Sequence, residues 1–168
     1  MTKPNPPGRS SGGSDTPVTP AVAALYDPVL VRHARTPYGR GPLAPAVSAT
    51  GVNRPCGDRV LFHTQVVDGR LVVRFEGEGC ALALGSASAL CQAADGQELN
   101  DVRAVAEAFR RSLDAPPSES IEPVIADDLG HFLAVRAFPA RRGCVRLAPD
   151  VLLDALDALA SQSAPESS

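Results

Sequence analysis

A chain of 168 residues, of which 44% are hydrophobic, fits a single globular domain with a core of its own. Aromatic residues make up only 4% and tryptophan is absent, so the core is expected to consist of valine, leucine and alanine. The net charge of −3 argues against a nucleic-acid-binding surface, which needs a basic patch or stripe.

Hydrophobic stretches of the roughly 18–20 residues that cross a membrane are missing from the sequence. The N-terminus is rich in proline, glycine and serine, where a signal peptide needs a hydrophobic segment. We therefore expect a cytoplasmic protein without a membrane partner. Four cysteines in a reducing compartment favour metal binding or reactive thiols over disulfides.

Three segments are expected along the chain. Residues 1–20 should be a disordered tail, because they lack large hydrophobic residues that could anchor them. Residues 21–160 form the folded domain, and residues 161–168 form a second, polar tail. Within the domain, the spacing of hydrophobic residues predicts a helix over residues 21–35, ended by the proline- and glycine-rich run 36–42.

A β-hairpin is predicted next. Residues 59–67 and 70–76 alternate as strands do, and Asp68-Gly69 between them is a typical two-residue hairpin turn. Cys56 and Asp58 precede the first strand, and Cys80 follows the second. Because an antiparallel hairpin brings its two open ends together, we expect these three side chains at one edge of the sheet.

Helices should fill the rest of the domain. Small residues over 81–93 predict a helix that packs closely on the sheet, and a second helix has good amphipathic period over 99–113. A third is expected over 122–137, followed by a turn from Phe138 into Cys144, and Pro149 is expected to open the last helix. The predicted fold is α+β, a short antiparallel β-sheet packed against helices.

Three cysteines and one aspartate could bind a metal ion. Cys56 and Asp58 flank a glycine after a proline, Cys80 follows a glycine-rich run and opens a helix, and Cys144 follows Arg141-Arg142-Gly143. Together they offer a complete tetrahedral set for Zn²⁺, and the carboxylate would be the ligand that exchanges most easily. The alternative is that the cysteines are buried core residues and the aspartate caps a turn.

The remaining cysteine and the first histidine have simpler interpretations. Cys91 lies in the middle of a predicted helix beside leucine, so core packing accounts for it better than chemistry does. His33 lies among basic residues of the first helix and is expected to be exposed.

Four motifs in this order resemble the U-type iron–sulfur assembly proteins, the family of IscU, SufU and the NifU N-terminal domain. The motifs are Pro55-Cys56-Gly57-Asp58-Arg59, Phe75-Glu76-Gly77-Glu78-Gly79-Cys80, Ser86-Ala87-Ser88 and Phe138-Pro139-Ala140-Arg141 shortly before Cys144. The similarity runs from about Leu25 to Leu156, which is most of the chain.

The resemblance implies a zinc-bound sulfur acceptor in which Cys56 takes persulfide sulfur from a SufS-type cysteine desulfurase. The sulfur would then pass to downstream iron–sulfur assembly proteins. One alternative is a scaffold on which an iron–sulfur cluster is built, and another is a binding module whose zinc only holds the fold. Whether such a protein counts as an enzyme in its own right stays open.

Two features place the chain closer to SufU than to IscU. Gly143 stands where the IscU branch has histidine before the last cysteine and where SufU proteins commonly have lysine, and the LPPVK motif of the IscU branch is absent. Extra length over residues 115–130 is typical of the SufU branch. Arg141 is either a solvated surface charge or a contact to the partner near the metal, and the resemblance favours the contact.

Overall fold

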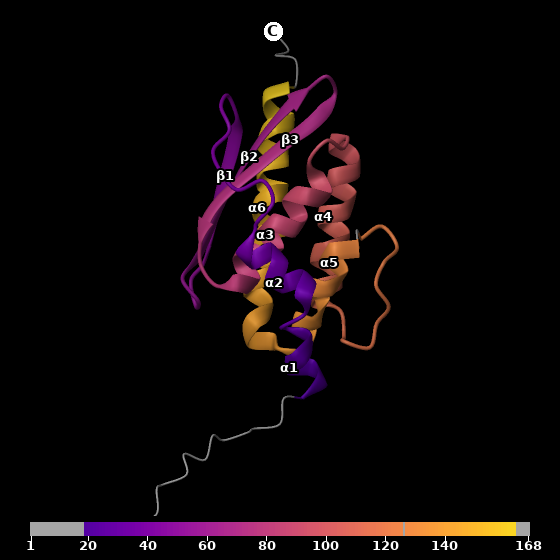
Figure 1. Cartoon of the computed structure of the whole chain (residues 1–168). Coiled ribbons are helices and arrows are strands. Elements are labelled where there is room, and N and C mark those ends of the chain that lie inside the picture. Colours follow the sequence, from indigo (N-terminus) through magenta and orange to yellow (C-terminus); the bar gives the residue numbers. More distant parts are fainter. Residues whose placement is uncertain (1–18, 126, 164–168) are drawn as a thin grey trace, which may run out of the picture.

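The structure is a computed structural model that describes residues 19–125 and 127–163 (Figure 1). The predicted N-terminal tail falls almost entirely outside the described residues, as does most of the predicted C-terminal one. The described part is an α+β sandwich with a three-stranded antiparallel sheet on one side and helices behind it. Of the helices that the structure describes, none combines the length and the hydrophobicity needed to cross a membrane.

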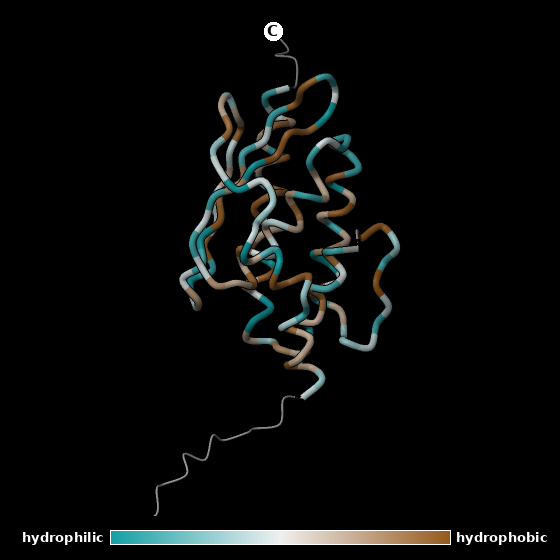
Figure 2. The backbone as a smooth tube through the Cα atoms, in the orientation of Figure 1, coloured by the Kyte–Doolittle hydropathy of each residue, from teal (hydrophilic) through white to brown (hydrophobic). Residues whose placement is uncertain are grey.

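The sheet has the order β1-β2-β3, with β1 at Val47–Asn53, β2 at Asp58–Val67 and β3 at Arg70–Glu78. The predicted hairpin is confirmed: Val67 pairs with Arg70, and both turn residues between them have positive φ. Buried and more exposed positions alternate along β2 and β3, and both hydrophobic and hydrophilic residues occur along the strands (Figure 2). Strand β1 was not predicted, because its small residues give little indication of a strand in the sequence.

Two helices cover the inner face of the sheet: α3 at Ala81–Ala94 and α6 at Pro139–Ser163. Strand β1 and α6 approach so closely that a Cβ atom on Gly51 would lie 2.5 Å from Val151 Cγ2. The core between the layers contains phenylalanine besides the expected valine, leucine and alanine; its largest members include Phe62, Phe75, Phe109, Phe132, Leu90, Leu129, Leu152 and Leu156.

The predicted first helix is two helices, α1 at Pro20–Ala24 and α2 at Pro28–Arg35. The break has a local cause. Asp27 caps α2, because its carboxylate accepts a hydrogen bond from the Val29 N–H at 2.8 Å, and Pro28 occupies the first turn without needing a donor. Helix α4, at Leu99–Asp114, agrees with the prediction.

The C-terminal third corrects three predictions. The helix expected over 122–137 is shorter and divided, with α5 at Asp127–Phe132 and a 3₁₀ segment, η1, at Leu133–Ala137. The last helix begins at Pro139, so Cys144 lies within α6 and not in a turn. Pro149 is inside this helix, which ends at Ser163.

A neighbouring helix makes Pro149 tolerable. Proline has no N–H to donate to the carbonyl four residues earlier, which is that of Val145. The buried Ser86 hydroxyl of α3, which bonds to the Ala83 carbonyl at 3.0 Å, also lies 3.5 Å from this Val145 oxygen. Part of the missing hydrogen bond is thus replaced across the α3–α6 contact.

Candidate metal centre

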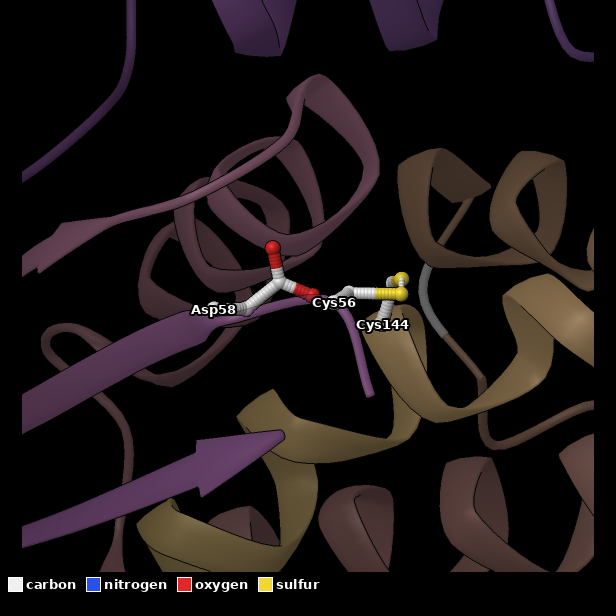
Figure 3. Close-up of side chains that lie close together, drawn as sticks. All are labelled: Cys56, Asp58 and Cys144. Atoms are coloured by element: carbon white, nitrogen blue, oxygen red, sulfur yellow. Dashed lines mark hydrogen bonds between the residues drawn. The ribbon is translucent and has the colours of Figure 1, made fainter. Parts of the chain in front are cut away.

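Three of the four predicted ligands lie together at the edge of the sheet. The ligand atoms of Cys56, Asp58 and Cys144 are all within 4.8 Å of one another. Figure 3 shows the two sulfur atoms side by side, with Asp58 beside them at the start of β2; the sulfur atoms are 3.3 Å apart. One ligand comes from a turn, one from a strand and one from a helix that is far away in the sequence.

The β1–β2 turn presents Cys56 to solvent. The Asn53 carbonyl accepts hydrogen bonds from the N–H groups of Cys56 and Gly57 at 3.3 and 2.8 Å, which closes the turn. Gly57 has φ +72°, a value that residues with a side chain adopt at a cost. Cys56 is exposed, whereas Asp58 and Cys144 are fully buried.

Asp58 is held by hydrogen bonds to both of its carboxylate oxygens. Its Oδ1 accepts from the Cys80 N–H at 2.9 Å, and its Oδ2 accepts from Asn53 Nδ2 at 3.1 Å. Burial raises the pKa of Asp58, but these bonds and one with the Cys144 side chain outweigh it, so the pKa lies below its ordinary value. The carboxylate is therefore ionised at neutral pH, although it is buried.

Glycine is required beside this carboxylate. Gly79 has φ +153°, and a Cβ atom there would lie 2.5 Å from Asp58 Oδ1 and 3.0 Å from Asp58 Cβ. The close approach lets the backbone that precedes α3 bring the Cys80 N–H to the carboxylate. The glycine-rich run before Cys80 thus has a structural purpose at the site itself.

The backbone of Cys80 lies at the site, because its N–H donates to Asp58. Its thiol is not among the three ligand atoms that lie within 4.8 Å of one another. Cys80 is the N-cap residue of α3 and half-buried, and its side chain makes no capping bond. Its thiol is near enough to help raise the pKa of Cys144, after burial and the hydrogen bonds with Cys56 and Asp58. Its predicted role as a fourth ligand stays a prediction.

Arg141 lies at the start of α6 and is exposed. Together with Cys80 it lines a groove of about 490 Å³. The other walls are mainly hydrophobic side chains of α1, α2 and the link between them, among them Leu25, Tyr26 and Leu30. Arg141 is therefore near the candidate site, on a surface open to other molecules.

The donor set fits zinc. Zn²⁺ prefers thiolate, imidazole and carboxylate ligands in tetrahedral geometry, and two thiols with one ionised carboxylate already converge here. Cys80 would complete the set. Without a cation, burial keeps the pKa of the Cys144 thiol above its ordinary value, so metal binding would have to displace its proton.

Cys91 lies apart from this centre, in the core as predicted. It is fully buried, its thiol donates to the Val73 carbonyl at 3.3 Å, and burial is the main cause that raises its pKa to about 12. The expectation of an exposed His33 was wrong, because its ring is buried between Ser88 at 2.7 Å and Asp128 at 2.8 Å. These partners are too distant in the sequence for local patterns to indicate.

Asn53 was not singled out from the sequence. Its side-chain amide donates to Asp58 and lies 3.5 Å from Cys144 Sγ, so it contacts two of the three converging groups. The only signal in the sequence was its position three residues before Cys56.

Comparisons with known proteins agree with this geometry. Residues 25–145 match the NifU-like N-terminal domain. The zinc-dependent sulfurtransferase SufU of Bacillus subtilis is 30% identical over 125 residues, which cover 73% of this chain and 83% of that protein. The iron–sulfur cluster assembly scaffold protein IscU of Thermotoga maritima is 26% identical over 134 residues, which cover 79% of this chain and 92% of that protein.

Solved structures show the same fold. The N-terminal part of a NifU-like protein from Brucella abortus superposes with a TM-score of 0.73 at 24% identity, over 85% of this chain and 99% of that one. A putative iron–sulfur cluster assembly scaffold protein for the SUF system from Fervidobacterium islandicum gives a TM-score of 0.68 at 20% identity, over 79% and 96%. The α+β prediction is confirmed, and the chain belongs to the IscU/NifU family of proteins with a NifU-like N-terminal domain.

Proposed function

We propose that this protein serves iron–sulfur cluster assembly as a zinc-bound sulfur acceptor. Cys56, Asp58, Cys80 and Cys144 hold one Zn²⁺ ion, and Cys56 accepts persulfide sulfur from a SufS-type cysteine desulfurase. One observation supports this most: Cys56 is exposed, while Asp58 and Cys144 beside it are buried. An exposed thiol can meet the persulfide of a partner while the buried groups keep the site in place.

The transfer of sulfur from the desulfurase to Cys56 needs no added oxidant. The Cys56 thiolate attacks the outer sulfur of the desulfurase persulfide, and a new S–S bond forms at Cys56. The S–S bond of the desulfurase breaks, and its cysteine leaves as a thiolate. Bound zinc would supply the positive charge that keeps the site thiols deprotonated near neutral pH. The sulfur on Cys56 then passes to downstream iron–sulfur assembly proteins.

The groove beside Cys80 is our candidate for the desulfurase contact. The groove combines hydrophobic side chains of α1 and α2 with the exposed guanidinium of Arg141. It also includes Cys80, whose backbone N–H donates a hydrogen bond to Asp58. A persulfide-bearing segment that entered there would approach the centre from the side of α3. Arg141→Glu should therefore weaken desulfurase binding and leave the zinc content unchanged.

The second candidate function is a scaffold for an iron–sulfur cluster. It is favoured by the similar IscU proteins and by the donor set, since thiolates bind iron as well as zinc. Metal analysis with a visible spectrum separates the two functions. A zinc-bound acceptor is colourless with about one zinc ion per chain, whereas a brown protein with stoichiometric iron and sulfide would favour the scaffold.

The central test pairs two cysteine-to-serine variants. Cys56→Ser should keep the fold and accept no sulfur, because a serine hydroxyl is not ionised near neutral pH. Cys91→Ser changes a buried core thiol in the same way and should accept sulfur as the unmodified protein does. The measurements are desulfurase turnover and mass spectrometry for one added sulfur atom. Full stimulation by Cys56→Ser, or a persulfide confined to Cys80 or Cys144, would rule out Cys56 as the acceptor.

A further inference from the structure

We propose that Asn53 is a positioning residue of the metal centre, and that Gly143 provides the space in which its side chain lies. The inference rests on the proposed function, because it assumes that Asp58 and Cys144 bind the metal. It assigns a role to Asn53, which is not one of the four proposed metal ligands. It also explains the glycine immediately before Cys144.

The Asn53 amide connects two ligands that come from different parts of the fold. Its Nδ2 donates to Asp58 Oδ2 at 3.1 Å and lies 3.5 Å from Cys144 Sγ. An amide nitrogen has two hydrogens, so it can serve both acceptors at once. The opposite amide orientation would direct the carbonyl oxygen at an ionised carboxylate, and the chemistry of the neighbours therefore fixes the orientation.

These contacts should control how Asp58 meets the metal. The carboxylate already accepts the Cys80 N–H on Oδ1, so Asn53 brings the second oxygen under restraint as well. A carboxylate held at both oxygens presents a defined lone pair to the cation and cannot rotate to chelate it with both oxygens. Partners of this kind around a metal site commonly change metal affinity by roughly 10–100-fold when they are removed.

The same amide distinguishes the two neighbouring thiols. It lies against the sulfur of Cys144, whereas the exposed Cys56 has no contact with it among the hydrogen bonds of the described residues. A hydrogen bond to a thiolate stabilises the anion and lowers its nucleophilicity, so the thiolate that accepts it is the less reactive of the two. Asn53 thus favours Cys144 as the ligand that stays, which leaves Cys56 as the thiol that reacts.

Gly143 leaves space for the amide on the α6 side. A Cβ atom at Gly143 would lie 3.2 Å from Asn53 Oδ1, 3.5 Å from Nδ2 and 3.6 Å from Cγ. The first of these distances is tighter than ordinary contact, so even alanine would press on the amide. Any longer side chain brings the same Cβ against the amide. Glycine in the interior of a helix is destabilising relative to alanine. At position 143 its lack of a side chain leaves the space in which the Asn53 amide lies.

The test uses Co²⁺ as the probe on the full chain after zinc is removed with a chelator. Cobalt reports thiolate ligation through charge-transfer bands and reports geometry through its visible bands. Asn53→Ala should bind Co²⁺ roughly 10–100-fold more weakly and shift the visible bands. Asn53→Asp keeps the shape but loses the donors, and it should weaken binding at least as much. Asn100→Ala, on the exposed start of α4, is the matched control and should change neither quantity.

A double variant tests the link between the two positions. Gly143→Ala should shift the cobalt bands in the same direction as Asn53→Ala, because it acts by moving the same amide. The variant with both substitutions should then bind Co²⁺ no more weakly than Asn53→Ala alone.

The outcomes separate the inference from the function on which it rests. Wild-type affinity and spectrum in both Asn53 variants would overturn the positioning role and leave the acceptor function standing. Fully additive losses in the double variant would overturn the link to Gly143. An unmodified protein that binds Co²⁺ without thiolate bands would overturn the metal centre, and with it both proposals.

Discussion

Replacing Gly79 by alanine should damage the candidate metal centre far more than a comparable glycine replacement elsewhere. The added Cβ would lie 2.5 Å from Asp58 Oδ1, whereas ordinary contacts begin at 3.4 Å. The carboxylate would therefore have to move by about 1 Å, which breaks its 2.9 Å bond with the Cys80 N–H. A hydrogen bond to a charged group contributes about 1.5–3 kcal/mol.

Backbone strain adds to this cost, and Gly41 allows the two effects to be separated. A residue with a side chain at the φ of Gly79, +153°, costs about 1–3 kcal/mol, for a sum of about 2.5–6 kcal/mol. Gly41 has the similar φ of +143°, but a Cβ atom there would meet nothing within 4 Å. Gly41→Ala should therefore show the strain without the displaced carboxylate.

The assay is thermal and urea unfolding of both variants without metal, followed by zinc titration. At roughly 2–4 °C per kcal/mol for a domain of this size, Gly79→Ala should unfold about 3–12 °C below Gly41→Ala. Only Gly79→Ala should bind zinc more weakly, because only it displaces a proposed ligand. Equal unfolding temperatures and equal zinc affinities for the two variants would refute the argument.

Two further predictions concern groups outside the centre. Burial raises the pKa of the Cys91 thiol to about 12, so Cys91 should resist iodoacetamide at pH 8 in the folded protein and react once urea unfolds the chain. Modification of Cys91 in the folded protein would contradict this. Burial raises the pKa of Asp95, but hydrogen bonds from Tyr38 and Arg74 and a backbone N–H outweigh it, so its pKa lies below 3.8. A lowered carboxyl pKa stabilises the fold above the unfolded value of 3.8, and this contribution disappears as the pH falls through the folded value. Asp95→Asn should therefore lower the free energy of unfolding at pH 7, and the difference from the unmodified protein should shrink as the pH falls below 3.8 in urea unfolding measured across pH. A difference that does not change with pH would contradict this.

The hairpin and the meeting of Asp58 with Cys80 were accessible from the sequence because their causes are local. Asp68-Gly69 adopts the positive φ angles that a two-residue turn needs, and that turn fixes the pairing of the strands. The pairing then brings the start of β2 and the residues after β3 to one edge, where the Cys80 N–H meets Asp58. No knowledge of the remaining fold is needed for this step.

Other features depend on contacts between distant segments, and local patterns could not indicate them. Pro149 is a good helix starter by sequence, but it lies inside α6, where Ser86 of another helix approaches the carbonyl that its missing N–H leaves free. His33 has basic neighbours in the sequence, yet Ser88 and Asp128 enclose it from two other helices. Asn53 has a role at the site only because α6 brings Cys144 beside it.

The arrangement of the centre bears on which proposed ligand would move during the proposed sulfur transfer. A carboxylate is the weaker zinc ligand by chemistry, but Asp58 is fully buried and held at both oxygens. Cys56 is the stronger ligand by chemistry, but it lies on an exposed turn, where a Cβ atom on the adjacent Gly57 would touch nothing within 4 Å. The side chain that can move is therefore the thiol, since a displaced turn breaks no core contact. A firmly placed but weakly binding carboxylate suits this motion, because it keeps the cation at the site while the thiol is away and competes little with the thiol when it returns.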